Sequence, residues 1–101
     1  MKKSKLNIPQ KEIADFCRAN RIRRMALFGS VLRDDFTPSS DVDILVEFDG
    51  DARVGMIRLA TLEMELSRLL GRKVDLNTPG FLSKYYRNHI LSEAEVQYDA
   101  A

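Results

Sequence analysis

Apolar residues recur at helical spacing in two parts of the chain. Residues 9–20 place apolar side chains at i, i+3 and i+4, and residues 54–70 place leucines at i, i+3, i+7 and i+10. Both spacings gather the apolar side chains on one face of a helix. Pro9 suits the first turn of the earlier helix, and Gly71 follows the later one as its C-terminal cap. The pattern therefore predicts two amphipathic helices.

Short apolar runs bounded by turn residues lie between and after these helices, and such runs are typical of strands. They predict strands at 22–28, 41–48 and 73–76, a turn or short helix from Ser30 to about Asp34, a helical segment from Thr78 to Leu91, and a last short strand at 96–98. The resulting order, α-β-α-β-α-β with a helical C-terminal segment, indicates an α+β fold in which helices cover a small sheet.

The composition indicates one globular domain over residues 1–101. Hydrophobic residues make up 45% and charged residues 31%, and a net charge of +1 gives no support to direct nucleic-acid binding. No stretch approaches the roughly 18 apolar residues of a membrane helix, and the start lacks the apolar run of a signal peptide. Cys17 is the only cysteine, which excludes an internal disulfide. We expect Cys17 to be buried and the protein to be cytoplasmic, with no membrane contact.

Paired aspartates stand at the head of the second predicted strand. Because side chains alternate along a strand, Asp41 and Asp43 point to the same face, about 7 Å apart. In the third predicted strand, Asp75 lies between the apolar residues Val74 and Leu76. If the two strands are neighbours with their apolar faces together, Asp75 emerges beside the other two. The sequence therefore predicts three carboxylates around one point.

Three carboxylates in one place repel one another, and a bound cation removes that cost. Oxygen ligands without a nearby His or Cys favour Mg²⁺ or Mn²⁺ over zinc. The charge distribution agrees, since residues 28–48 carry five acidic residues and one basic residue, a net charge of −4, and the rest of the chain carries +5. This region of the chain is the expected metal site.

A Gly-Ser pair ends the first predicted strand and complements the carboxylates. Gly29 lets the backbone approach a ligand closely, and Ser30 adds a hydroxyl next to N–H groups suited to phosphate oxygens. A phosphate-binding turn opposite a carboxylate-bound metal pair is the equipment of nucleotidyl transfer, in which metal ions neutralise a triphosphate and orient an acceptor hydroxyl.

The arrangement Gly29-Ser30, ten residues, then Asp41-x-Asp43 before an apolar strand resembles the signature of the DNA polymerase beta-type nucleotidyltransferase superfamily. Asp75 matches the later carboxylate of that signature. The run GSVLRDDFTPSSDVDILVEF is similar to the minimal nucleotidyltransferase (MNT) proteins, which are antitoxin partners of HEPN-domain RNase toxins. The resemblance covers residues 22–77. It implies the nucleotidyltransferase fold, with a small mixed sheet flanked by helices.

Residue roles follow from this resemblance. It implies that the catalytic and metal-binding residues are Asp41, Asp43 and Asp75, with two Mg²⁺ ions or Mn²⁺ as cofactors, and that Gly29, Ser30, Arg33 and Ser40 contact the nucleotide. Two positions depart from the usual family pattern. Leu32 replaces a small residue and Asp34 replaces a glycine, which bears on the shape of the turn.

The resemblance also implies a reaction, the transfer of AMP from ATP to a tyrosine of a cognate HEPN toxin, which silences the toxin. Two alternatives stay open. The protein could neutralise its toxin by binding alone, or it could modify a small-molecule acceptor. An incomplete site could also be supplemented by a second copy of the chain, so a homo-oligomer is a further interpretation.

Several of these residues have plainer interpretations. Asp41 could bond N–H groups of the preceding loop, and Asp75 could be a solvated residue on a short strand. Arg33 could pair with a neighbouring aspartate on the surface. His89 fits an exposed helix face better than a catalytic base. The aromatic residues at 85–86 share helical spacing with apolar neighbours, which favours the core and its rim over a ligand contact.

Overall fold

The computed structural model describes residues 6, 8–32, 36–37, 39–50, 54–82 and 84–100. The helices and strands are α1 (Gln10–Ala19), β1 (Ile22–Phe28), η1 (Gly29–Leu32), β2 (Val42–Phe48), α2 (Met56–Leu70), β3 (Val74–Asn77), η2 (Pro79–Phe81), α3 (Arg87–Glu93) and β4 (Glu95–Asp99), where η marks a short 3₁₀ helix. The predicted α+β order is confirmed, including the short last strand.

The described strands form one mixed sheet in the order β3-β2-β1-β4. β1 pairs antiparallel with both β2 and β4, whereas β2 and β3 run parallel. Parallel neighbours need a long crossover, and α2 supplies it. The second and third predicted strands are therefore neighbours, which is the condition for Asp75 to lie beside Asp41 and Asp43.

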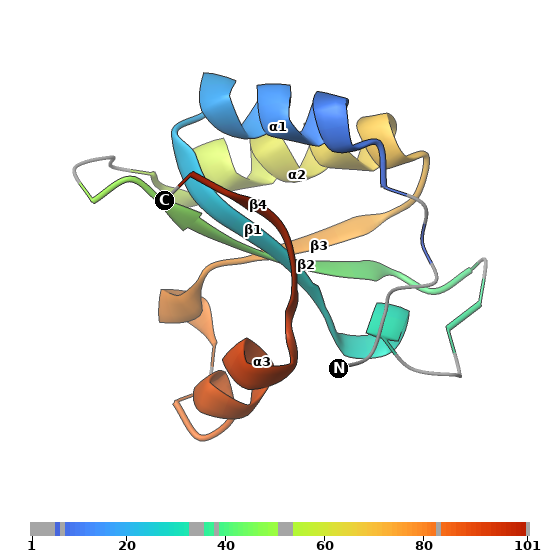
Figure 1. The fold of residues 1–101 in the computed structure, drawn as a ribbon, viewed down its shortest axis with the longest axis vertical. Coiled ribbons are helices and arrows are strands. Elements are labelled where there is room, and N and C mark those ends of the chain that lie inside the picture. The colour runs from blue at the N-terminus through green and yellow to red at the C-terminus, as the bar shows by residue number, and fades with distance from the viewer. Residues whose placement is uncertain are drawn as a thin grey trace.

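Both long helices lie on one face of the sheet (Figure 1). Their apolar stripes pack on alternate residues of the strands, and the core comprises Ile13, Phe16 and Cys17 of α1, Leu59, Leu62 and Leu66 of α2, and Met25, Leu27, Val42, Ile44, Val46, Val74 and Leu76 of the sheet, among others. Gly71 ends α2 in the left-handed conformation, with φ 67°. The helix predictions and the cap are thus confirmed.

The C-terminal segment from η2 to α3 lies on the other side of the sheet (Figure 1). Here the prediction of one helical segment was wrong, because Leu82 adopts an extended backbone and ends η2 before α3 begins at Arg87. Tyr85 and Tyr86 fall in the intervening turn and are 83% and 65% exposed, so they do not belong to the core. In the part of the chain that the structure describes, no helix has the length and apolar character needed to cross a membrane.

Candidate active site

The carboxylate of Asp43 lies against the turn that follows β1. Strand pairing places Phe28, the last residue of β1, opposite Asp43. Gly29 then turns the chain with φ 75°, and a Cβ built on it would stand 2.3 Å from Asp43 Oδ2. The backbone N–H of Ser30 donates a hydrogen bond to the same carboxyl group. The Gly-Ser turn and the second aspartate are therefore in direct contact.

Asp43 and Asp75 meet across the parallel pair of strands. They are register partners of β2 and β3, and their carboxyl groups interact with each other. Burial raises the pKa of Asp43, the negative charge of Asp75 raises it further, and the Ser30 N–H opposes both effects. Asp43 is half-buried, whereas Asp75 is exposed.

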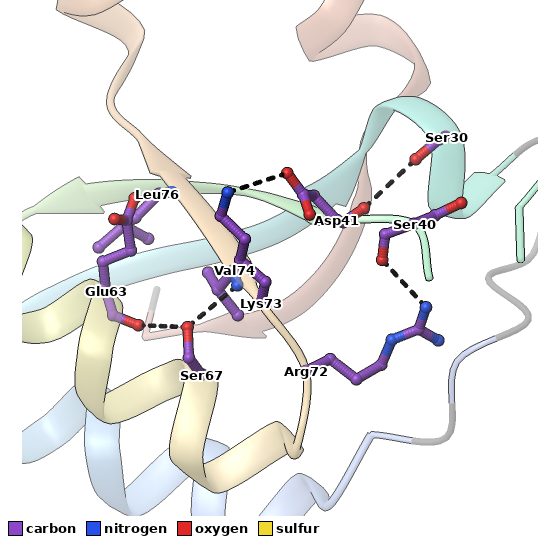
Figure 2. Close-up of polar contacts among 9 residues, drawn as sticks. All are labelled: Ser30, Ser40, Asp41, Glu63, Ser67, Arg72, Lys73, Val74 and Leu76. Carbon is purple, nitrogen blue, oxygen red and sulfur yellow. Dashed lines mark hydrogen bonds and ion pairs between the residues drawn. The ribbon is translucent and has the colours of Figure 1, made fainter. Parts of the chain in front are cut away.

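Asp41 precedes β2 and is oriented differently. Its Oδ2 lies 3.7 Å from Lys73 Nζ, and its backbone carbonyl accepts a hydrogen bond of 3.3 Å from Ser30 Oγ (Figure 2). The Lys73 side chain is 79% exposed, so the ion pair contributes little to stability. The charge of Asp41 nevertheless reaches Asp43, where it contributes to the raised pKa.

The described residues hold no three His, Cys, Asp or Glu side chains already gathered as a metal cage. The donor chemistry still fits a divalent cation. Burial and the charges of Asp75 and Asp41 raise the pKa of Asp43, and Asp41 itself pairs with the ammonium group of Lys73. A divalent ion would relieve the repulsion between these carboxylates, and carboxylate oxygens are ligands that Mg²⁺ and Mn²⁺ prefer.

Two other predicted site residues have separate outcomes. Ser40 Oγ accepts a hydrogen bond of 3.0 Å from the Thr37 N–H and lies 3.1 Å from Thr37 Oγ1, so its hydroxyl is engaged within its own loop. Arg33 lies outside the described residues. His89 forms a 3.7 Å contact with Glu93 on the exposed face of α3, which agrees with the plainer interpretation of this residue.

Sequence reasoning missed the basic pair Arg72-Lys73, which directly precedes β3. Lys73 contacts Asp41, and Arg72 Nη2 donates a hydrogen bond of 3.0 Å to the carbonyl oxygen of Ser40 (Figure 2). A signal was present, since a basic pair stands at the head of the strand that carries Asp75, and Ser40-Asp41 stands at the head of its parallel neighbour. Residues at the same end of adjacent parallel strands meet in space.

Comparisons with known proteins place the chain in a family. The nucleotidyltransferase domain family matches residues 10–96. MJ0435 of Methanocaldococcus jannaschii, which is named as a candidate protein adenylyltransferase, is 33% identical over 89 residues, 88% of this chain and 94% of that protein. The protein adenylyltransferase MntA of Thermococcus cleftensis is 35% identical over 72 residues, 71% of each chain.

Solved structures share the fold. A crystal structure of a toxin–antitoxin with AMP-PNP superposes with a TM-score of 0.74 and 21% identity, covering 91% of this chain and 74% of that one. The structure of a tri-AMPylated Shewanella oneidensis HEPN toxin in complex with an MNT antitoxin superposes with a TM-score of 0.66 and 22% identity, covering 89% of this chain and 69% of that one. The family match spans most of the sequence, and the curated relatives exceed 30% identity. The chain therefore belongs to the nucleotidyltransferase domain family of enzymes, and these curated relatives are named as protein adenylyltransferases.

Proposed function

We propose that this protein transfers AMP from ATP to a tyrosine hydroxyl of a HEPN-domain toxin and thereby neutralises the toxin. One observation carries the proposal: Asp43 and Asp75 meet in register across β2 and β3, directly against the Gly29-Ser30 turn. Divalent metal and nucleotide use are properties of the family. The protein acceptor is supported by relatives named as adenylyltransferases of proteins and by the AMPylated toxin of the structural neighbour.

In this proposal Asp41, Asp43 and Asp75 hold two Mg²⁺ ions, or Mn²⁺ in their place. When bound, such ions neutralise the triphosphate and orient the acceptor hydroxyl. To bind an ion, Asp43 must be ionised despite its raised pKa, and Asp41 must turn from Lys73. Because Gly29 has no side chain, the Asp43 carboxylate can lie directly against the backbone of the turn.

The transfer forms one bond and breaks another. The tyrosine oxygen attacks the α-phosphorus of ATP, the bond to the β-phosphate breaks, and pyrophosphate leaves. Asp75 is exposed and is assigned as the carboxylate that takes the tyrosine proton. Exposure of Asp41 and Asp75 also leaves the site open to an acceptor carried on another protein.

The proposed function is tested by mass spectrometry. The protein is incubated with ATP, Mg²⁺ and the HEPN toxin from the adjacent gene, and the intact mass of the toxin is measured. The toxin should gain one or more AMP units, and the gain should disappear with Asp43→Asn, with Asp75→Asn, and with phenylalanine at the acceptor tyrosine. Asp15→Asn is the control, because Asp15 is an exposed aspartate of α1 that pairs with Arg18 of the same helix. A stable complex whose toxin mass stays unchanged would refute enzymatic transfer and leave neutralisation by binding.

A further inference from the structure

Arg72 connects the turn before β3 to the loop before β2. One nitrogen of its guanidinium, Nη2, donates hydrogen bonds of 2.6 Å to the Thr37 carbonyl and 3.0 Å to the Ser40 carbonyl. The guanidinium carbon lies 4.3 Å from the centre of the Phe36 ring. One arginine thus holds the loop at three of its residues. The charge, the planar shape and the stacking surface of a guanidinium are all used, and lysine offers only the charge.

The residue after Arg72 continues this connection. The carbonyl oxygen of Lys73 accepts a hydrogen bond of 2.9 Å from the Val42 N–H, and its ammonium group lies 3.7 Å from Asp41. Two consecutive residues before β3 therefore hold three consecutive residues at the head of β2. Figure 2 shows Arg72 directed to Ser40 and Lys73 directed to Asp41.

The turn that carries Arg72, together with β3, is hydrogen-bonded to α2. The Arg72 N–H donates 3.1 Å to the Ser67 carbonyl, and the Ser67 hydroxyl accepts 3.0 Å from the Val74 N–H. One turn earlier, Glu63 Oε2 accepts 2.8 Å from the Leu76 N–H. Because these bonds flank Asp75, the same rigid piece of structure carries both Asp75 and Arg72.

We propose that Arg72 is a positioning residue of the metal and nucleotide site. It acts through the backbone of the loop and sets where Ser40 and Asp41 stand relative to Asp43 and Asp75. Without it, the loop keeps its internal bonds between Thr37 and Ser40, and Lys73 still contacts Asp41 and Val42, but the two hydrogen bonds from Arg72 to the loop carbonyls are lost. The consequence for ligand binding rests on the proposed function, whereas the consequence for the loop itself does not.

Two measurements test this role, one of which needs no metal. Hydrogen exchange of the Ser40 and Val42 amides, followed by NMR, should accelerate about tenfold in Arg72→Ala, since two bonds to a charged donor are lost. The affinity for Mn²⁺ with AMP-PNP, measured by calorimetry, should fall by about the same factor. Arg72→Lys should fall between the wild type and Arg72→Ala in both measurements, and millimolar methylguanidinium should partly restore Arg72→Ala.

Arg68→Ala is the matched control, because it removes the same charge from an exposed position in the last turn of α2. It should leave both quantities unchanged. Phe36→Leu keeps Arg72 but removes the ring beneath it, and it serves if Arg72→Ala fails to fold; it should shift both quantities in the same direction by a smaller factor.

Two results would overturn the inference. Unchanged exchange at Ser40 and Val42 would show that Arg72 does not hold the loop. A lowered melting temperature with full ligand affinity in the folded protein would show that it only stabilises the fold. If the wild type itself bound no Mn²⁺ with AMP-PNP, the proposed function would fail and the positioning role with it, while the exchange data would still decide whether Arg72 holds the loop.

Discussion

Asp43 lies directly against the backbone of Gly29, and this contact depends on two separate properties of glycine. The first is conformational, because φ of 75° is strained for a residue with a side chain. The second is steric, because a Cβ would stand 2.3 Å from Asp43 Oδ2. Two other glycines separate these effects. Gly71 has φ of 67° with open space around its Cβ position, and Gly50 has open space without a positive φ.

We expect Gly29→Ala to be the most destabilising of the three substitutions, by about 1–3 kcal/mol, because it combines strain with the clash. Gly71→Ala should cost about 1 kcal/mol from conformation alone, and Gly50→Ala should be nearly neutral. Urea unfolding monitored by circular dichroism measures all three. Equal effects of Gly29→Ala and Gly71→Ala would show that Asp43 does not press on the turn.

The pKa of Asp43 is raised by burial and by the charge of Asp75, and this has a consequence for stability. A carboxyl group with a raised pKa in the folded state binds its proton more tightly there than in the unfolded chain. Its contribution to stability is present below the unfolded pKa and is lost as the pH rises through the folded pKa. At neutral pH, ionised Asp43 therefore opposes folding of the metal-free protein.

Asp43→Asn should accordingly have a higher melting temperature than the wild type at pH 7 without metal. The difference should shrink as the pH falls to about 3, below the pKa of the unfolded state, where the wild-type carboxyl is largely protonated in both states. Addition of Mg²⁺ should reverse the order, since a ligand that binds only the folded wild type stabilises it. Scanning fluorimetry across pH measures this. Lower metal-free stability of Asp43→Asn at pH 7 would contradict the argument.

At the scale of elements, β3 is the edge strand that carries Asp75, and α2 fixes its outer side. Ser67 and Glu63, one turn apart on α2, accept hydrogen bonds from the N–H groups of Val74 and Leu76. These groups would otherwise be unpaired at the sheet edge. The other side of β3 pairs with β2 in a register that places Asp75 beside Asp43. The placement of Asp75 thus depends on a helix that crosses over the sheet.

Ser67→Ala should destabilise the protein by about 1–2 kcal/mol, because the N–H of buried Val74 loses its acceptor. Thr61→Ala is the matched control. The hydroxyl groups of Ser67 and Thr61 both donate to the carbonyl four residues earlier on α2, at 2.8 and 3.1 Å, but Thr61 is exposed and this hydrogen bond stays within the helix. The control should change the free energy of unfolding by less than about 0.5 kcal/mol. Equal losses of unfolding free energy in Ser67→Ala and Thr61→Ala would show that Ser67 does not stabilise β3.

At the scale of the whole molecule, the two long helices and the sheet enclose one core, and Cys17 belongs to this core with 0% exposure. Burial raises the pKa of Cys17 to about 12, with a small opposing effect from Arg18. The thiol is therefore both inaccessible and protonated in the folded protein, and thiolate is the reactive form.

Cys17 should react with Ellman's reagent only when the core opens. At pH 8 the native protein should label slowly, at a rate that rises with urea in parallel with unfolding, and the fully unfolded chain should label at once. Absorbance measures the release of the chromophore. Fast labelling of native protein would show that α1 separates from the sheet without global unfolding. That residues 1–101 form one domain stays a prediction of the sequence.

The local pattern of residues determined most of the elements. Helical spacing, strand runs and the glycine cap were sufficient for α1, β1, β2 and α2 within a few residues, since each depends on neighbours in sequence. The C-terminal segment was the exception. Its apolar residues suggested one helix. Instead the backbone becomes extended at Leu82, and Tyr85 and Tyr86 are exposed. The helix that follows, α3, has no buried residue, so packing on the sheet does not impose one long helix on this segment.

The sequence also determined which residues were candidates for the site, through the Gly29-Ser30 pair and the three aspartates. Only the tertiary structure decided how they meet. The register of β2 with β3, the contact of Gly29 with Asp43, and the hold of Arg72 on the Ser40 loop join residues that are 14 to 32 positions apart. Such contacts depend on how the elements pack, and no spacing within one element encodes them.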